Sequence, residues 1–294
     1  MFKQILSAGA ALLLAAPAIA QAPAPRITVP ASCANGGLSA ADYKLFKAAL
    51  AAAVKVQPAN GGLAFNMWAS LVANDGTVCA VAFSGEKFTD QWLASRVISA
   101  QKAFTANSLS LGKVDGASDK GALALSTANL YSAVQPGGSL YGLQHSNPVA
   151  PAGAYGDTIA GGAYQGPAVP PAAVYGTQND PMVRQIIGGI NVFGGGLALY
   201  AATGKVGGVG VSGDTSCTDH MVAWRIRHIL NLDLLKTAGI AGPASLFAGD
   251  PNHPDNIIFD ITPNPSGGTG ISKSGFGHAT CLNTPNPKAL PPVQ

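Results

Sequence analysis

Two hairpin-then-helix patterns constrain the fold of this chain more than any other feature of its sequence. The first occupies residues 63–108 and the second residues 190–230. In each, two short apolar runs flank a turn, and a segment follows in which apolar residues recur three or four positions apart, the period of a helix. The first turn, Asn74-Asp75-Gly76, suits a tight hairpin because an Asp-Gly pair tolerates positive φ. The second is Thr203-Gly204-Lys205.

Hairpins, unlike β-α-β crossovers, predict a mainly antiparallel sheet with helices packed against it, so the expected class is α/β of the α+β kind. The first strand is expected to start at Leu63 and to alternate, with Asn66 and Ser70 facing away from the core. Apolar stripes predict four helices. Their positions are Tyr43, Phe46, Leu50 and Val54; Leu93, Val97, Ala100 and Phe104; Leu123, Thr127, Leu130 and Val134; and Val222, Ile226 and Ile229.

The N-terminus has the pattern of a secretory signal peptide over residues 1–20. Lys3 precedes an apolar run that is too short to span a bilayer, and Ala18-Ile19-Ala20 supplies a small-x-small cleavage site. The alternative is an uncleaved membrane anchor. Cleavage before Gln21 predicts a periplasmic or secreted protein without a membrane span. It would begin with a linker over residues 21–37, of which residues 21–32 are expected to be disordered.

Charge gives no sign of a nucleic-acid partner. The chain has 17 Lys and Arg against 14 Asp and Glu, a formal net charge of +3, and only 11% of its residues are charged. A nucleic-acid surface needs clustered basic residues, and here they are scattered. So few charges in a Gly- and Ala-rich chain leave apolar surface exposed, which favours a homo-oligomer.

The chain has four cysteines, and an even number in an exported protein favours disulfides. They contain no C-x-x-C pair and lie too far apart for a zinc ribbon. Of the three pairings that four cysteines allow, we favour two bonds. Cys33–Cys79 would tie the mature N-terminus to the second strand, and Cys217–Cys281 would tie the C-terminal tail to the last helix.

Two long irregular stretches accompany the hairpin patterns. Residues 143–180 are rich in Gly, Pro, Ala and Tyr without a clear period, which predicts an inserted loop. Residues 233–294 form a loop-rich tail with one expected strand over residues 256–261. The uncharged run 186–203 is long enough for a membrane helix, but its glycines and its turn favour two half-length strands. We expect one domain over residues 38–232.

Three strings carry a resemblance to a known family. They are VANDGTVCAVAFSG, SRVISAQKAFTANS and GKVGGVGVSGDTSCTDH. Together they resemble the GlcG/HbpS-like family of small haem-binding, sometimes haem-degrading, proteins. The resemblance covers roughly residues 38–232 and implies a profilin-like antiparallel sheet flanked by helices, a haem or related tetrapyrrole ligand, and a homo-oligomer. Neither the insert nor the tail belongs to the compact family core.

This resemblance directs attention to the start of the last helix. His220 is the best single axial ligand for haem iron, since imidazole is a common proximal ligand, and the alternative is a capping or surface histidine. Free N–H groups near Asp219 are expected to attract a haem propionate. Thr105 supplies a hydroxyl nearby, and Lys102 or Arg96 a positive charge for carboxylates. The alternative for Thr105, Lys102 and Arg96 is a core or solvated position. Trp92 and Tyr131 are candidates for packing on the faces of a flat porphyrin, and core positions are their alternative.

Other motifs favour no established enzyme class. Residues 208–213 read G-x-G-x-x-G with Asp233 twenty positions on, but a dinucleotide-binding unit needs a parallel strand after the helix. No hydrolase or zinc-protease signature is present in the sequence, so catalysis stays an open question. His253 and His278, in the tail, are expected to be structural. The rival functions are a small-molecule enzyme using a pocket lined by the insert, and a cofactor-free accessory module that binds a partner.

Overall fold

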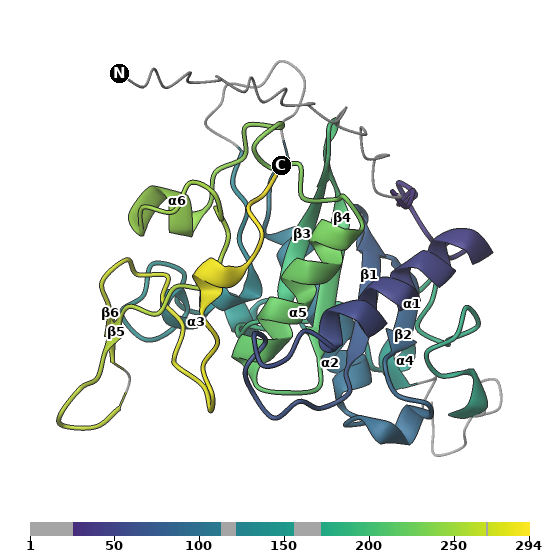
Figure 1. Ribbon diagram of the computed structural model, residues 1–294, viewed down its shortest axis with the longest axis horizontal. Helices are drawn as coiled ribbons and strands as arrows, with labels where there is room; N and C mark the ends of the chain where they lie inside the picture. The colour runs from purple at the N-terminus through teal and green to yellow at the C-terminus, as the bar shows by residue number, and fades with distance from the viewer. Residues whose placement is uncertain (1–25, 113–121, 156–171, 269) are drawn as a thin grey trace, which may run out of the picture.

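The computed structural model describes residues 26–294 except 113–121, 156–171 and 269, so the predicted signal peptide lies outside the described residues (Figure 1). Its centre is a four-stranded sheet in which every neighbouring pair is antiparallel, in the order β2-β1-β4-β3. The bounds are Trp68–Ala73 for β1, Val78–Phe83 for β2, Gly196–Ala201 for β3 and Gly204–Ser212 for β4. The α+β class with an antiparallel sheet is therefore confirmed.

The two hairpin patterns form the two halves of this sheet. β1 pairs with β2 and β3 pairs with β4, and the halves meet along β1 and β4, where Leu71 lies opposite Val209. The turn at Asn74-Asp75-Gly76 is confirmed, and Gly76 has the positive φ of 85° that such a turn requires. The uncharged run 186–203 contributes β3 and its turn. No helix among the described residues is long and apolar enough to cross a membrane.

Helices cover both faces of the sheet (Figure 1). Helix α2 (Ser95–Ser108) packs on β4, β1 and β3, whereas α1 (Ala40–Val54) and α5 (Ser216–Ile229) pack on each other and on the opposite face. Successive residues of β4 separate the two sides. Val209 and Val211 join the core with Met221 and Val222 of α5, while Gly210 lies against Ser99 of α2.

Because both faces are covered, every residue of β1 is buried and the predicted alternation of apolar and polar positions is wrong. The strand also starts at Trp68 rather than Leu63, which is exposed. Ser70 is buried under α2, and its hydroxyl lies 2.7 Å from the Ser99 hydroxyl. The pairing of these two hydroxyls is what permits a polar side chain at this core position.

Glycines in β4 set the distance between the sheet and α2. A Cβ at Gly210 would collide with the backbone carbonyl oxygen of Ser99, and one at Gly208 with that of Ala103. The G-x-G-x-x-G string is thus a close-packing feature of an antiparallel strand. Since β4 is antiparallel to both of its neighbours, the parallel strand of a dinucleotide-binding unit does not follow it in the described sheet.

Several elements are shorter than predicted. The helix expected from about residue 90 begins at Ser95, after a 3-10 turn over Phe88–Asp90, and Leu93 is exposed. The third helix is reduced to a 3-10 turn over Thr127–Asn129 and to α3 (Leu130–Ala133). The strand expected over residues 256–261 is reduced to β5 (Ile261–Thr262). The remaining α-helices and strands of the described residues are α4 (Pro151–Tyr155), α6 (Pro243–Phe247) and β6 (Ile271–Ser272).

Both ends of the described chain are packed into this core. The predicted disulfides Cys33–Cys79 and Cys217–Cys281 are both present. Ile27 lies in the stretch that was expected to be disordered, but its side chain is buried in the main core. The tail is likewise integrated, because Val293 joins the main core and the Trp224 indole N–H donates to the Pro291 carbonyl oxygen at 2.9 Å.

Candidate functional site

The N-terminus of α5 carries two of the predicted ligand residues, Asp219 and His220, and Lys102 of α2 reaches it. Thr215 caps the helix through its hydroxyl, which accepts from the Thr218 N–H. The Asp214 carboxylate accepts from the Leu63 and Phe65 N–H groups at 3.0 Å. The Asp214 N–H in turn donates to Asp219 at 3.0 Å. Protein groups therefore already engage the region where the sequence predicted a haem propionate.

Lys102 and Asp219 form a buried ion pair between α2 and α5. Their Nζ and Oδ2 atoms are 2.7 Å apart, and Nζ also donates to the Val211 carbonyl oxygen at 3.1 Å. The ammonium lies 4.5 Å from the ring centroid of Phe193. Burial raises the pKa of Asp219 and lowers the pKa of Lys102, and the attraction between the two charges opposes both shifts.

His220, one residue further along α5, is fully buried and carries an unpartnered ring nitrogen. Its Nε2 lies 3.1 Å from Oδ1 of Asn256, whose amide N–H₂ donates to the Pro287 carbonyl oxygen. The Ile257 N–H lies 3.2 Å from Nε2 but only 2.8 Å from the same Asn256 oxygen, so we assign that N–H to the amide oxygen. The oxygen is then an acceptor facing Nε2, which places the ring proton on Nε2 and the lone pair on Nδ1. Nδ1 has no hydrogen-bond partner among the described residues. Burial lowers the pKa of His220 to about 3, which keeps the ring neutral.

A glycine-rich segment over residues 188–195 connects the predicted site residues. At one end, the Thr105 hydroxyl donates to the Gln101 carbonyl oxygen and accepts from the Asn191 N–H at 2.9 Å. At the other end, Gly194 lies close enough that an added Cβ would be 3.1 Å from Cβ of His220. Asn191 Oδ1 is a second buried atom without a described partner. The segment thus crosses from Thr105 on α2 to His220 on α5.

Arg96 does not join this group of residues. Its guanidinium pairs with the Asp180 carboxylate and lies 4.3 Å from the ring centroid of Tyr175. It therefore anchors the C-terminal end of the 143–180 insert to α2. Trp92 is 53% exposed, and its ring packs edge-on against Phe65.

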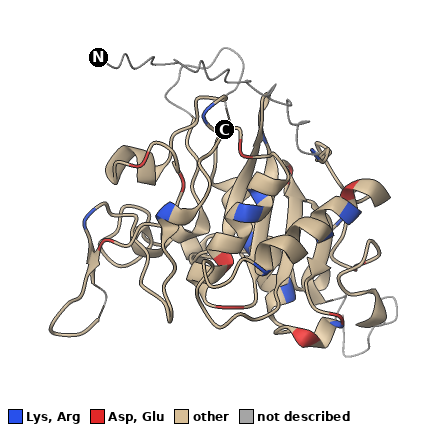
Figure 2. Cartoon of the chain, viewed as in Figure 1, with Lys and Arg blue, Asp and Glu red and all other residues tan. Residues whose placement is uncertain are grey.

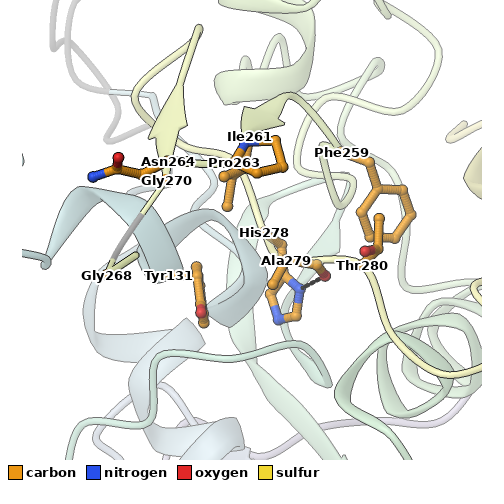
Figure 3. Close-up of a pocket in the computed structure, with 10 residues that line it drawn as sticks. All are labelled: Tyr131, Phe259, Ile261, Pro263, Asn264, Gly268, Gly270, His278, Ala279 and Thr280. Carbon is orange, nitrogen blue, oxygen red and sulfur yellow. Dashed lines mark hydrogen bonds between the residues drawn. The ribbon is translucent and has the colours of Figure 1, made fainter. Parts of the chain in front are cut away.

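His278 is the residue that sequence reasoning missed, because it was expected to be structural. It lines a cavity of about 310 Å³ together with Tyr131 and Phe259 (Figure 3). Its Nδ1 donates to the Ala279 carbonyl oxygen at 2.7 Å, and its Nε2 accepts from the Gly194 N–H at 3.2 Å. Burial lowers its pKa to about 4. The available signal was its spacing: His278 precedes Cys281 by three residues, as Cys217 precedes His220.

The remaining histidines have other surroundings. His228 is half-exposed on α5, with its Nδ1 2.7 Å from Asp233, and His253 pairs with Asp250 in the tail. His145, in the insert, is exposed. In the view of Figure 2, Lys and Arg residues are interspersed with Asp and Glu over the described chain, which agrees with the scattered charge of the sequence.

No family model and no curated protein sequence matches this chain. Several solved structures are similar to it. The chain is similar to Klebsiella pneumoniae ORFY, described as DUF336, with 26% identity over 63% of this chain and 88% of that one, at a TM-score of 0.37. PduOC, solved as a haem complex, is 21% identical over 67% and 96%, at 0.40. A double mutant of Streptomyces reticuli HbpS is 15% identical over 76% and 99%, at 0.36.

The three structures include HbpS, a namesake of the family that the sequence strings resemble. The TM-scores are low, and the chemistry of this chain therefore rests on its own residues.

Proposed function

We propose that this is an exported protein that binds haem or a related tetrapyrrole, with His220 as the nitrogen ligand. The observation that supports this function is the unpartnered Nδ1 of a buried, neutral histidine. A buried polar atom without a partner typically costs about 1–3 kcal/mol, so its presence calls for a role. A neutral imidazole lone pair is what haem iron requires of an axial ligand.

Space for a planar ligand has to be made, since His220 is fully buried. The segments against it are residues 188–195 and the tail at Asn256 and Ile257. Gly188, Gly189 and Gly195 all have positive φ, so this segment can adopt backbone conformations closed to other residues. Displacement of the glycine-rich segment is the movement that the proposal requires.

The carboxylates of a tetrapyrrole need partners, and Lys102 is the nearest cation to His220 on α2. Its ammonium is now held by Asp219, so a propionate at Lys102 would replace that carboxylate. Burial already raises the pKa of Asp219 to about 6, which favours its protonation when the pair opens. Thr105 would lie at the far end of the displaced segment, and Arg96 is proposed only as a more distant charge.

Haemin titration followed by visible absorption tests the proposal. The mature chain should give a Soret band that saturates at one haemin per chain, and His220→Ala should weaken binding and shift the band. His228→Ala, on the same helix but half-exposed, is the matched control and should behave as the unaltered protein does. Unchanged affinity and spectrum in both His220→Ala and His220→Gln would contradict the assignment.

Export and association are parts of the same proposal. The two disulfides suit an oxidising compartment, and intact-mass measurement of natively exported protein should find a chain beginning near Gln21 with no free thiol. Exposed apolar side chains, among them Trp92, Phe247 and Ile271, support a homo-oligomer. Light scattering giving the mass of a single chain would contradict the oligomer.

A further inference from the structure

The disulfide Cys217–Cys281 has a histidine beside it. The two sulfur atoms and a ring nitrogen of His278 all lie within 4.8 Å of one another. Two thiolates and an imidazole are the ligand set that zinc and similar divalent cations prefer. Ligand atoms around a tetrahedral zinc lie about 3.5 Å apart, so only small movements separate this arrangement from a metal site.

We propose that Cys217, Cys281 and His278 form a divalent-cation site for a soft metal such as Zn²⁺ when the disulfide is reduced. In the oxidised protein the sulfurs are bonded to each other and hold the tail to α5. In the reduced protein the same three residues hold the tail through the metal. Reduction thereby exchanges one crosslink for another at the same place in the fold.

The environment of the sulfurs favours their thiolate forms. Cys217 lies in the first turn of α5, where helix N–H groups and the helix dipole stabilise negative charge. The Cys217 N–H donates to Sγ of Cys281 at 3.2 Å, and the Ser216 hydroxyl lies 3.6 Å from the same sulfur. These contacts would stabilise the charged sulfurs that a metal requires.

The environment of His278 matches that of a metal-ligating histidine. Its Nδ1–H donates to the Ala279 carbonyl oxygen, which fixes the tautomer and leaves the lone pair on Nε2. The ring also lines the 310 Å³ cavity shown in Figure 3, which gives a cation a route to the site. The metal would replace the Gly194 N–H as the partner of Nε2.

Reduction by a dithiol balances as thiol–disulfide exchange. One thiolate of the dithiol attacks Sγ of Cys281, the less buried sulfur, and forms a mixed disulfide while the Cys217 thiolate leaves. The second thiolate of the dithiol then attacks the dithiol sulfur that is bonded to Cys281 and releases the Cys281 thiolate. Two electrons pass to the protein, the dithiol becomes a disulfide, and the divalent cation takes the place of the two thiol protons.

The other disulfide provides a matched control within the chain. Cys33–Cys79 lies in the main core, and among the described residues no His, Asp or Glu completes a metal-ligand group with it. The Cys33→Ser/Cys79→Ser variant should therefore keep the proposed site. The Cys217→Ser/Cys281→Ser variant should lose it.

Cobalt titration of the mature chain, reduced with dithiothreitol and then desalted without oxygen, tests the site. The reduced protein and Cys33→Ser/Cys79→Ser should each bind one Co²⁺ with a sulfur-to-cobalt charge-transfer band, and the oxidised protein should not. His278→Ala should bind about tenfold more weakly or worse, while His253→Ala, another tail histidine, should match the unaltered chain. The proposal is overturned if the reduced chain shows no such band, if Cys217→Ser/Cys281→Ser keeps it, or if His278→Ala leaves affinity unchanged.

Discussion

The two hairpin–helix units share an order of elements but contribute different side chains to the core. The first unit supplies bulky apolar side chains, with Trp68 and Val72 packing under α2 and Leu71 on the opposite face. The second unit presents Gly208 and Gly210 to the helix of the first unit. The first unit therefore fills the core with large side chains, and the glycines of the second unit allow α2 to approach the sheet closely.

The helices differ in the same sense. The N-terminal turns of α5 carry Cys217, Asp219 and His220, all buried. On α2 the buried charges Arg96 and Lys102 each need a partner from elsewhere in the chain. The candidate ligand residues therefore lie where α5 begins. Helix α2, on the other face of the sheet, supplies Lys102 as the partner of Asp219.

The largest expected effect comes from breaking the ion pair that links the two units. Lys102→Ala leaves the Asp219 carboxylate buried without its partner, which should lower the free energy of unfolding by about 3–5 kcal/mol. Lys44→Ala, on the exposed side of α1, is the control and should change it by less than about 0.5 kcal/mol. Urea unfolding measures both. Equal effects would mean that the Lys102–Asp219 pair does not stabilise the folded protein.

Acid should destabilise the protein by a few kcal/mol through two buried histidines near the start of α5. His220 and His278 have pKa values lowered to about 3 and about 4, so below pH ~6.5 the unfolded chain binds protons that the folded chain does not. The stability they contribute is present above pH ~6.5 and is lost as pH falls toward these values. Asp219, with its pKa raised to about 6, opposes this over part of the range.

Unfolding midpoints measured between pH 7 and pH 4 check this sign. His220→Gln should reduce the pH dependence, and His145→Gln, at an exposed position in the insert, is its control. The same acid dependence in His220→Gln as in the unaltered protein would contradict the contribution of this ring.

A smaller effect is expected from filling the space that the second unit leaves for α2. Gly210→Ala forces a Cβ against the Ser99 carbonyl oxygen and should destabilise the protein by about 1–3 kcal/mol. Gly36→Ala, where nothing lies within 4 Å of the added Cβ, is the matched control. Thermal unfolding should separate the two variants. Similar melting temperatures would show that α2 can move away without loss.

The sequence predicted the hairpins, the sheet type and both disulfides, because strand periodicity and turn chemistry are local signals. It misjudged β1, since alternation was expected from a half-covered sheet and helices cover both faces. Single-sequence periodicity also extended the third helix well beyond α3.

Prediction of the site was limited by long-range contacts. That Lys102 meets Asp219 and that Arg96 meets Asp180 depends on how α2 crosses the sheet, which no local pattern encodes. His278 was passed over because its neighbours in space, Gly194 and Cys217, lie far from it in sequence.

Titration of haemin and of Co²⁺ into the same two variants tests the central claim, that the start of α5 carries two separate ligand functions. His220→Ala should lose haemin affinity in the oxidised protein and keep the cobalt charge-transfer band in the reduced protein. His278→Ala should keep haemin binding and weaken cobalt binding by about tenfold or more. If each variant binds both ligands as the unaltered chain does, or if both variants lose both ligands together, the division of this region into a His220 site and a His278 site is contradicted.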